Sequence, residues 1–359
     1  SGYTRFLEGD ILLPKITPTF QADRTVIATG IEGGVGVATT EVHVVRVKPC
    51  AERRYIRYLF SAKGFLAEGA AAMFGVAGQK RVPDDLLRDL TVPVTNLIRQ
   101  RAISDFLDRE TARIDALIGL SEKRVIVARE RLAVMTEALV LGRKYDRIRS
   151  NDSQDPLHLV PDGWVRRRNK TFLREVVELS DTGDEELLTV SHITGVTPRS
   201  ERDVTMFLSE SNEGYKRVQR GDLVINTMWA WMGALGVSLC VGIVSPAYAV
   251  YRFTTDGVDS RYFDSLFRSP AYVTEMTRFS RGVWTSRLRL YPESFLALRT
   301  PFPPAARQRR IAEEIAEFRQ EERRLIDMFN DSARLLAERR RALITAAVTG
   351  ELQIPGVAV

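Results

Sequence analysis

Residues 305–350 read AARQRRIAEEIAEFRQEERRLIDMFNDSARLLAERRRALITAAVTG, and this stretch decides the fold because the chain carries a second version of it. Residues 86–142 align without a gap on residues 294–350, at a constant offset of 208 positions. The alignment pairs Arg99-Gln100-Arg101 with Arg307-Gln308-Arg309. Because solenoid repeats are only about 20 to 50 residues long, this spacing predicts two copies of a whole domain, each followed by a long segment.

Both long segments have the properties of helices. Neither 95–142 nor 305–350 contains a proline, and each closes at a glycine, which suits the left-handed position after a helix. At about 1.5 Å per residue, each helix would be roughly 70 Å long. Steps of four and three residues trace a mostly apolar seam with a heptad period along both helices. The predicted seam comprises Ile103, Leu107, Glu110, Ile114, Leu117, Ser121, Arg124, Ala128, Arg131, Met135 and Ala138 in the first helix, and Ile311, Ile315, Phe318, Glu322, Leu325, Phe329, Ser332, Leu336, Arg339, Leu343 and Ala346 in the second. Two matched seams predict that the helices pair with each other as an antiparallel coiled coil with pseudo-twofold symmetry.

The duplication also extends upstream of the helices. The stretch from Gly9 to Leu12 resembles the one from Gly221 to Val224, and Arg54-Tyr55 resembles Arg261-Tyr262. In the second copy, short apolar runs at 176–179, 187–190, 223–225 and 248–253 alternate with turn residues, and a helix-like stretch follows at 260–279. This pattern is typical of an α+β domain with a curved, mostly antiparallel sheet.

The two copies differ at their starts. The stretch from Trp164 to Arg220 precedes Gly221, whereas only eight residues precede Gly9. We therefore expect the first domain to lack its opening strands. The predicted division is a partial first domain at 1–94, a spacer helix at 95–142, a polar linker at 143–162, a second domain at 163–304, a second spacer helix at 305–350 and a C-terminal tail at 351–359.

The composition of the 359 residues is that of an ordinary globular protein, with 44% hydrophobic and 27% charged residues. The net charge is +6, which permits binding to a polyanion but does not establish it. The sequence shows no signal peptide and no apolar stretch of membrane-spanning length, so we expect a cytoplasmic protein. Cys50 and Cys240 lie in apolar runs in separate copies, which predicts buried thiols and no disulfide or metal pair.

No catalytic or metal-binding constellation is recognisable. The three histidines, His43, His158 and His192, have no Cys, Asp or His at ligand spacing. The glycines between Gly30 and Gly36 have the wrong order for a dinucleotide-binding loop, and they predict a hairpin. We therefore expect the chain to bind neither a metal nor a cofactor.

Four loops carry residue types that can read a DNA duplex, in which Arg pairs with guanine and Asn, Thr and Ser reach base edges or phosphates. In the second copy these loops are 226–231, which follows a strand, and 281–289, which interleaves basic, aromatic and hydroxyl residues. The corresponding loops of the first copy are 15–19 and 78–81. The candidate DNA-binding residues are Lys15, Thr17, Thr19, Gln79, Lys80, Arg81, Asn226, Thr227, Trp229, Trp231, Arg281, Trp284, Thr285, Ser286, Arg287 and Arg289. The alternative is that the three tryptophans are core residues with surface arginines beside them.

A second apolar edge runs along the helices beside the predicted seam. It contains Leu335, Leu343, Ile344 and Val348 in the second helix, and Val127 and Val140 in the first. Two helices need only one seam to pack on each other. The additional edge therefore predicts a docking face for a partner helix.

Together these features resemble the specificity subunit of a type I restriction-modification enzyme. The resemblance rests on the duplicated Gly-Asp strand, the Gly-x-x-[Ser/Thr] motifs at 36–39 and 242–245, the Arg-Gln-Arg-x-Ile opening of each helix, and the closing run 338–352. It covers nearly the whole chain, and the partial first domain departs from the family pattern. The resemblance implies a non-enzymatic reader of double-stranded DNA, with two target-recognition domains inverted about the paired helices and each reading one half of a gapped site.

The resemblance also implies partners. The helices would bind two methyltransferase subunits, which bring S-adenosylmethionine, and motor-nuclease subunits that use Mg and ATP join them in restricting complexes. Two alternatives stay open. One is a coiled-coil interaction protein whose mixed domains bind protein or glycan. The other is an enzyme that uses Asp10 and Asp222 as acids, although tight turns entering strands account better for these Gly-Asp pairs.

Overall fold

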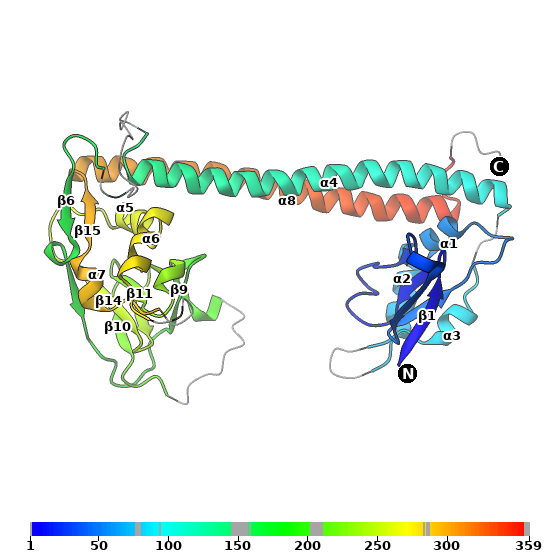
Figure 1. Ribbon diagram of the computed structural model, residues 1–359, viewed down its shortest axis with the longest axis horizontal. Helices are drawn as coiled ribbons and strands as arrows, with labels where there is room; N and C mark the ends of the chain where they lie inside the picture. The colour runs from blue at the N-terminus through cyan, green and yellow to red at the C-terminus, as the bar shows by residue number, and fades with distance from the viewer. Residues whose placement is uncertain are drawn as a thin grey trace. The chain divides into compact units, whose positions relative to one another are not determined.

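The computed structural model describes residues 2–75, 80–92, 95–144, 157, 159–201, 211–282, 284 and 288–354. The chain divides into two compact units: unit 1 comprises residues 1–126 and 326–359, and unit 2 comprises residues 127–325. Two long helices, α4 (Leu97–Val140) and α8 (Ala305–Thr349), contribute to both units (Figure 1). None of the helices described has both the length and the apolar character needed to cross a membrane.

Unit 1 contains the first mixed domain, a small antiparallel sheet packed against short helices. Its elements are β1 (Tyr3–Leu7), β2 (Ile11–Pro14), β3 (Val26–Ile27), η1 (Glu32–Gly34), β4 (Val35–Thr39), β5 (Val42–Val45), α1 (Arg53–Phe60), α2 (Lys63–Ala72) and α3 (Asp84–Arg88). The sheet has the order β3-β2-β5, and β1 pairs separately with β4. Buried residues of the sheet, such as Ile11 and Leu13, form one core with Phe60 of α1 and Phe65 of α2.

Unit 2 contains the larger second domain. Its elements are β6 (Val165–Arg168), η2 (Asn169–Thr171), β7 (Leu173–Val176), β8 (Leu188–Ser191), β9 (Gly195–Pro198), η3 (Arg199–Glu201), β10 (Lys216–Val218), β11 (Leu223–Asn226), η4 (Ala230–Met232), β12 (Leu235–Val237), β13 (Gly242–Val244), β14 (Tyr248–Phe253), α5 (Ser260–Phe267), α6 (Pro270–Phe279), α7 (Pro292–Ala297) and β15 (Arg299–Phe302). Its main sheet is antiparallel with the order β12-β11-β14-β7. The predicted α+β class is confirmed.

Two predicted elements of this domain have different bounds in the structure. The strand expected at 176–179 ends at Val176 and begins at Leu173. The helix expected at 260–279 is two helices, because Pro270 has no N–H to donate and instead starts α6, where the Ser269 side chain caps the new helix.

The two domains share a strand framework with the same register. β2 pairs antiparallel with β5, with Leu12 opposite Val44, and β11 pairs antiparallel with β14, with Val224 opposite Val250. These are the residues that the internal repeat aligns. The β1·β4 ribbon corresponds to the β10·β13 ribbon in the same way. The duplication in the sequence is therefore a duplication of geometry.

The domains differ in how far this framework is covered. In unit 2, β7 pairs with the outer side of β14, and residues beside β8 bond to β13. Within the described part of unit 1, no strand takes the place of β7 beside β5. As a result, Ile243 of β13 is fully buried, whereas the matched Val37 of β4 is 64% exposed.

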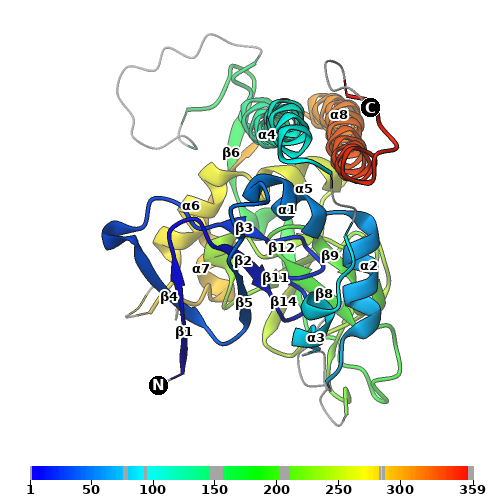
Figure 2. The same ribbon diagram turned by 90° about the vertical axis from the view of Figure 1, so that its right-hand side faces the viewer.

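The long helices pack on each other in antiparallel fashion in each unit (Figure 1 and Figure 2). In unit 1, Asp115 of α4 forms an ion pair of 2.9 Å with Arg340 of α8. Farther along α4, the Arg124 guanidinium lies 5.4 Å from the centroid of the Phe329 ring of α8. The contact that lies farther along α4 lies earlier along α8. The predicted antiparallel pairing is therefore confirmed.

In unit 2, the same seam contains a buried carboxylate. Glu322 is fully buried and forms an ion pair of 3.0 Å with Arg131, whose guanidinium also lies 5.1 Å from the centroid of the Phe318 ring. A lone buried charge is costly, whereas one with an opposite charge beside it is tolerated. Arg131 therefore allows an acidic residue to occupy a seam position.

The predicted seam is correct in part. The residues confirmed as buried are Ile103, Leu107, Ile114, Ser121 and Ala128 on α4, and Ile311, Ile315 and Glu322 on α8. Leu117 is half exposed, and Val125 is buried where Arg124 was predicted. Near the end of α8, Ile344 and Ala347 are buried, one position beyond the predicted Leu343 and Ala346. A helix has 3.6 residues per turn, so a strict 3.5-residue pattern drifts away from the true contact face.

The cysteine prediction was wrong for one residue. Cys50 is exposed, because it lies in the turn that follows β5, and Cys240 is half buried. Both are free thiols.

Candidate nucleic-acid interface

In each domain an Asp–Arg ion pair fixes the turn that leads into the central strand. The Asp10 carboxylate accepts hydrogen bonds of 2.8 and 2.7 Å from Arg46. The Asp222 carboxylate accepts two hydrogen bonds of 2.9 Å from Arg252. Both aspartates are almost fully buried, and each also accepts a backbone N–H from the residue three positions before it.

These contacts give both aspartates a structural role. Hydrogen bonds from Arg46 hold the pKa of Asp10 below its ordinary value, so the carboxylate stays charged. A general acid needs a proton to give and access to a substrate. The buried, arginine-bound Asp10 offers neither, and Asp222 is buried against Arg252 without access to a substrate, which argues against the enzyme alternative.

The two candidate loops of unit 2 lie against each other at the end of β11. The backbone N–H of Leu290 donates to the Thr227 carbonyl at 3.0 Å, and Arg289 Nε donates to Thr227 Oγ1 at 3.3 Å. Arg281 and Arg289 form a backbone bridge in which each N–H donates to the other carbonyl at 2.9 Å. Two segments far apart in the sequence thus form one corner, which we call corner 2.

Aromatic rings cover corner 2. Trp229 and Trp231 stack with ring centroids 6.1 Å apart and an angle of 18° between their planes. Trp231 Nε1 donates to the Met228 carbonyl at 3.1 Å, which holds the stack in place. Trp229 is 49% exposed and Trp284 is 68% exposed, so neither is a core residue. The corner therefore presents exposed tryptophan side chains, Trp229 and Trp284, to its surroundings.

Corner 2 also presents positive charge. Arg281 and Arg289 are exposed, and in the part of the chain that is described neither has an acidic partner. Asn226 and Thr227, by contrast, are buried. Thr227 Oγ1 donates to the Ala247 carbonyl at 2.9 Å, and Asn226 Oδ1 accepts from the Met228 N–H at 3.3 Å. These two side chains shape the loop, so a surface contact for them was a wrong expectation.

The two candidate loops of unit 1 also meet, at the end of β2. The Thr17 N–H donates to the Lys80 carbonyl at 3.0 Å, and the Lys80 N–H donates to Thr17 Oγ1 at 3.3 Å. The Val82 N–H donates to the Lys15 carbonyl at 2.8 Å. We call this arrangement corner 1. The sequence predicted the two loops of each pair, and the structure places each pair side by side.

The basic residues of corner 1 are more constrained than those of corner 2. Arg81 forms a bidentate pair with Glu41, with contacts of 2.6 and 2.8 Å, and these hydrogen bonds lower the pKa of Glu41. Lys15 Nζ lies 3.1 Å from Asp84 Oδ1. Only exposed Lys80 is a basic candidate of this corner without an acidic partner among the described residues.

The other candidates of these loops contribute less to a surface. Thr19 is exposed, and its hydroxyl donates to the Ile16 carbonyl at 2.8 Å. Gln79, Thr285, Ser286 and Arg287 lie outside the described residues.

Comparisons with known proteins agree with this architecture. No protein-family model matches the chain. A stretch of 103 residues, 28% of the chain, is 41% identical to 18% of the type I restriction enzyme EcoAI specificity subunit of Escherichia coli. A stretch of 93 residues, 26% of the chain, is 44% identical to 16% of the EcoEI specificity subunit of Escherichia coli. Each match spans less than one fifth of the curated relative.

Solved structures extend the likeness to nearly the whole chain. A chain from a structure of a type I restriction-modification system has a TM-score of 0.66, with 98% of this chain and 85% of that chain covered at 16% identity. The HsdS subunit from Thermoanaerobacter tengcongensis has a TM-score of 0.51, with 97% and 82% covered, also at 16% identity. The chain resembles type I specificity subunits. At these identities, the structural likeness shows the fold alone.

In this specificity-subunit fold, the predicted docking edge on the helices is smaller than expected. Ile344 and Val348 are buried in a core with α1, and Val140 is buried against α5. Their proposed contact with a partner was therefore wrong, because the ends of the long helices pack on the chain's own domains. Leu335 and Val127 are 55% and 60% exposed and remain candidates, while Leu343 is half buried.

One basic surface of the specificity-subunit fold was missed. Arg168 of β6 and Arg299 of β15 are directly opposite each other in the β6·β15 ladder, and both are exposed. Like charges in facing positions repel each other unless an anion lies nearby. The run Val165-Arg166-Arg167-Arg168 was the signal for this surface, although the sequence did not reveal Arg299 as its neighbour.

Proposed function

We propose that the chain is the non-catalytic DNA-reading subunit of a type I restriction-modification system. Each domain reads one half of a bipartite site in double-stranded DNA, and the paired helices determine the gap between the halves. Two methyltransferase subunits dock on the helices and bring S-adenosylmethionine. Motor-nuclease subunits add the steps that use Mg and ATP, and the chain itself binds no cofactor.

The observation that carries this proposal is the pair of matched corners. In both domains, the loop after the central strand, β2 or β11, is hydrogen bonded to a second loop that precedes a short helix, α3 or α7. Corner 2 combines exposed Arg281 and Arg289 with exposed tryptophan side chains, and corner 1 exposes Lys80. Basic groups supply phosphate contacts and arginine can pair with guanine, so two such corners fit two separate short sequences.

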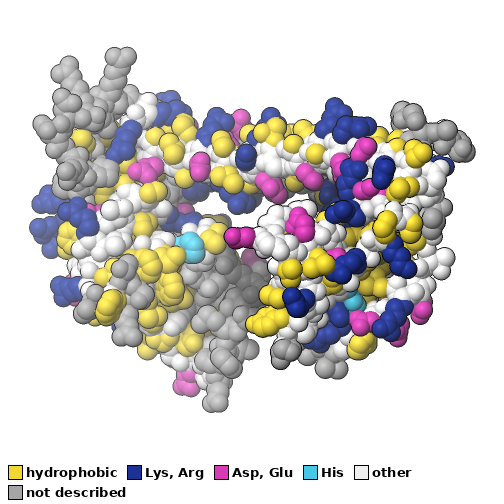
Figure 3. All heavy atoms as spheres, turned by 45° about the vertical axis from the view of Figure 1, so that its right-hand side comes forward, with side chains coloured by type: hydrophobic (Ala, Val, Ile, Leu, Met, Phe, Trp, Pro, Cys, Tyr) yellow, Lys and Arg dark blue, Asp and Glu magenta, His cyan; other side chains and the backbone are white. Residues whose placement is uncertain are grey.

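Matched apolar residues on the helices support the docking of two similar partners. Leu120 and Val127 lie seven residues apart on α4, and Met328 and Leu335 occupy the positions that the repeat aligns with them on α8. The four side chains are between 45% and 60% exposed. Figure 3 shows hydrophobic side chains among the charged ones along the helices. One apolar stripe on each helix suits one partner subunit for each helix.

A selection experiment tests the DNA-reading role. The full chain, with its methyltransferase partners where they are needed, is mixed with a library of random duplexes at about 0.1 M salt, and the bound duplexes are sequenced. We expect two short base sequences, here called words, to be enriched at a constant separation. Arg281→Ala should weaken enrichment of one word, and Lys80→Ala should weaken enrichment of the other.

The matched control is Arg323→Ala, which removes an exposed arginine from α8 and should leave both words unchanged. An equal loss of binding to all duplexes in Arg281→Ala would show phosphate contact without base reading. No enrichment by the wild-type complex would contradict the proposed function.

A further inference from the structure

A buried glutamine near the start of α8 ties the second domain to the helix. Gln308 is fully buried. Its Oε1 accepts the backbone N–H of Asp259 at 2.9 Å, and its Nε2 donates to the Pro303 carbonyl at 2.8 Å. Asp259 is the residue that caps α5. One side-chain amide thus connects α8, the segment that leads into α8 and the start of a domain helix.

The first domain repeats this arrangement with different neighbours. Gln100 of α4 is 2% exposed. Its Oε1 accepts the backbone N–H of Glu52 at 2.8 Å, and its Nε2 donates to the Thr95 carbonyl at 2.7 Å. Glu52 caps α1 as Asp259 caps α5. The same three segments are connected in both units, although the flanking residues differ.

A tyrosine attaches each domain to the end of the other long helix. The Tyr262 hydroxyl of α5 donates to the Val140 carbonyl of α4 at 2.9 Å. The Tyr55 hydroxyl of α1 donates to the Val348 carbonyl of α8 at 3.3 Å. Burial raises the pKa of both tyrosines, so the hydroxyl keeps its proton and remains a donor. We call each combination of glutamine and tyrosine a latch.

The latches can fix the angle between each domain and its helices more strictly than the surrounding apolar contacts can. Burial of apolar surface is favourable in many orientations, because the hydrophobic effect has no direction. Hydrogen bonds weaken steeply away from a straight geometry, and a buried amide or carbonyl without a partner is destabilising. Each latch uses three such bonds to three separate segments. A rotation of the domain on its helices would break at least one of them.

We infer that the latches, Gln308 with Tyr262 in unit 2 and Gln100 with Tyr55 in unit 1, are positioning residues that determine which gap length the chain accepts. The inference rests on the proposed function, since a gap exists only between two half-sites. The latches do not touch DNA. They hold each corner at one angle to the helices.

The test varies the gap and leaves both enriched words unchanged. Duplexes are made with the wild-type gap and with gaps one base pair shorter and longer, and their affinities for the full complex are measured. The wild-type complex should prefer its own gap by roughly fivefold or more, the lower end expected when one base contact is lost. Gln308→Met and the milder Tyr262→Phe should reduce that preference to below about twofold, while both words remain the preferred ones.

Gln320→Met is the matched control, because it makes the same change at an exposed position on the same helix. It should keep the wild-type preference. A purely structural role would weaken binding to all three gaps by the same factor and leave the preference intact, and that result would overturn the inference. Failure of the wild-type complex to enrich any gapped site would instead overturn the proposed function.

Hydrogen exchange tests the latch without DNA. The Asp259 amide should be protected in the wild-type chain and should exchange at least about tenfold faster in Gln308→Met, since its acceptor is gone. Unchanged protection would show that the bond does not hold the domain, and the inference would fail even if DNA binding is intact.

Discussion

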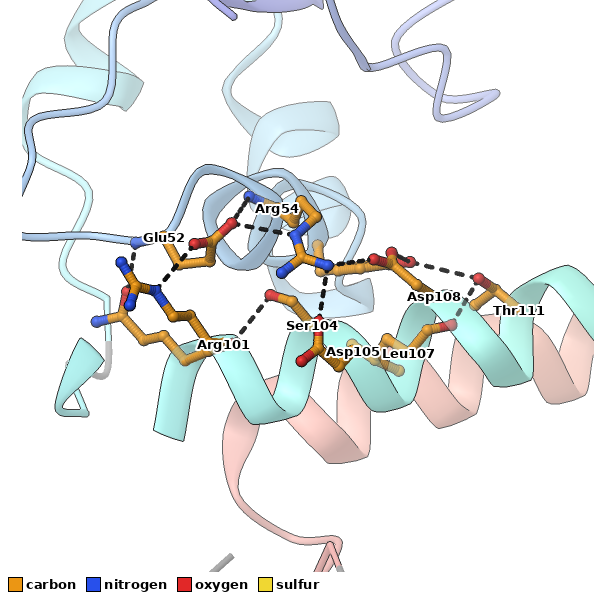
Figure 4. A network of polar contacts seen from close by, with 10 residues as sticks. Glu52, Arg54, Arg101, Ser104, Asp105, Leu107, Asp108 and Thr111 are labelled. Atoms are coloured by element: carbon orange, nitrogen blue, oxygen red, sulfur yellow. Dashed lines mark hydrogen bonds and ion pairs between the residues drawn. The ribbon is translucent and has the colours of Figure 1, made fainter. Parts of the chain in front are cut away.

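The two junctions between domain and helix use the same hydrogen bonds in very different surroundings. In unit 1, Arg54 of α1 pairs with Asp105 at 2.8 Å, with Asp108 at 2.7 Å and with Glu52 at 3.1 Å (Figure 4). Tyr58 adds a hydrogen bond of 2.7 Å to Asp108. Charged side chains therefore lie beside Glu52, the partner of Gln100 in the first latch, whereas Tyr55 of that latch packs in an apolar core.

Aromatic side chains surround the second latch. Phe263, beside Tyr262 on α5, is fully buried, and its ring lies 5.1 Å from that of Phe172 and 5.4 Å from that of Phe302. The matched Arg261 pairs with Asp259 of its own helix cap. The charged and aromatic contacts beside the two latches thus differ, while the directional bonds stay the same. The shared bonds are thus the part that the geometry of the fold requires.

The largest loss of folding stability is expected at the aromatic junction. Phe263→Ala should destabilise unit 2 by about 3 to 5 kcal/mol, because it leaves a cavity among packed rings. Denaturant unfolding followed by tryptophan fluorescence measures this loss. Phe279→Ala removes a 44% exposed ring of the same domain and should cost less than about 1 kcal/mol. Similar losses for the two variants would show that the rings around the latch are not the core of the junction.

The next largest losses of stability test whether the two domains are copies of one framework. Asp10→Asn and Asp222→Asn should each destabilise their unit by about 1 to 2 kcal/mol, because each weakens a bidentate pair at a buried turn. Equal losses are expected, since the hydrogen bonds match within 0.2 Å. A loss in only one unit would contradict the equivalence of the turns.

The Asp10 pair also predicts a pH dependence. Hydrogen bonds from Arg46 lower the pKa of Asp10 in the folded state, so its contribution to stability is complete above the ordinary carboxyl pKa near 4. The contribution is lost as the pH falls through the lowered pKa. Urea unfolding at decreasing pH should therefore show the wild type approaching Asp10→Asn below about pH 4. A constant difference down to pH 2 would contradict this assignment.

A smaller loss of folding stability is expected at the charged junction. Arg54→Met should destabilise unit 1 by about 1 kcal/mol at low salt, since the arginine is partly exposed and solvent screens its ion pairs. The loss should shrink at about 1 M salt, where the Debye length is roughly 3 Å. Arg261→Met should cost less at both salt concentrations. A loss from Arg54→Met that does not depend on salt would indicate lost packing of its stem.

The smallest effect on stability is expected at the outer face of the helices. Val127→Asp and Leu335→Asp should each change the free energy of unfolding by less than about 0.5 kcal/mol, because both side chains are exposed. Both should reduce co-elution with the methyltransferase on a sizing column. Ala133→Asp is the control, because this exposed position lies about 120° around α4 from Val127 and so off the proposed stripe. Unchanged co-elution of both variants would remove this face from the proposed interface.

Much of the fold could be predicted from the sequence, because its signals are local or repeated. The absence of proline and the closing glycines placed both long helices to within two residues, at Leu97–Val140 and Ala305–Thr349. The repeat also predicted which strands correspond. The docking edge was predicted less well. Ile344 and Val348 have the spacing of a partner-binding stripe, and only the tertiary structure shows that the chain's own α1 covers them.

The candidate interface, like the fold, could be predicted from the sequence only in part. Residue types in loops predicted which segments form each corner, because basic, aromatic and hydroxyl residues gather there. The sequence did not show that Arg81 is held by Glu41, forty positions earlier. It also did not show that Thr227 is turned inward to the Ala247 carbonyl. Such pairings depend on the register of strands, which composition does not specify.

Methylation-sensitive sequencing of the source genome shows most directly whether two domains held on paired helices read two short words at one separation. We predict a gapped motif methylated on both strands, and loss of that methylation when the gene for this chain is deleted. Methylation that persists unchanged after the deletion, or a motif without a gap, would contradict it.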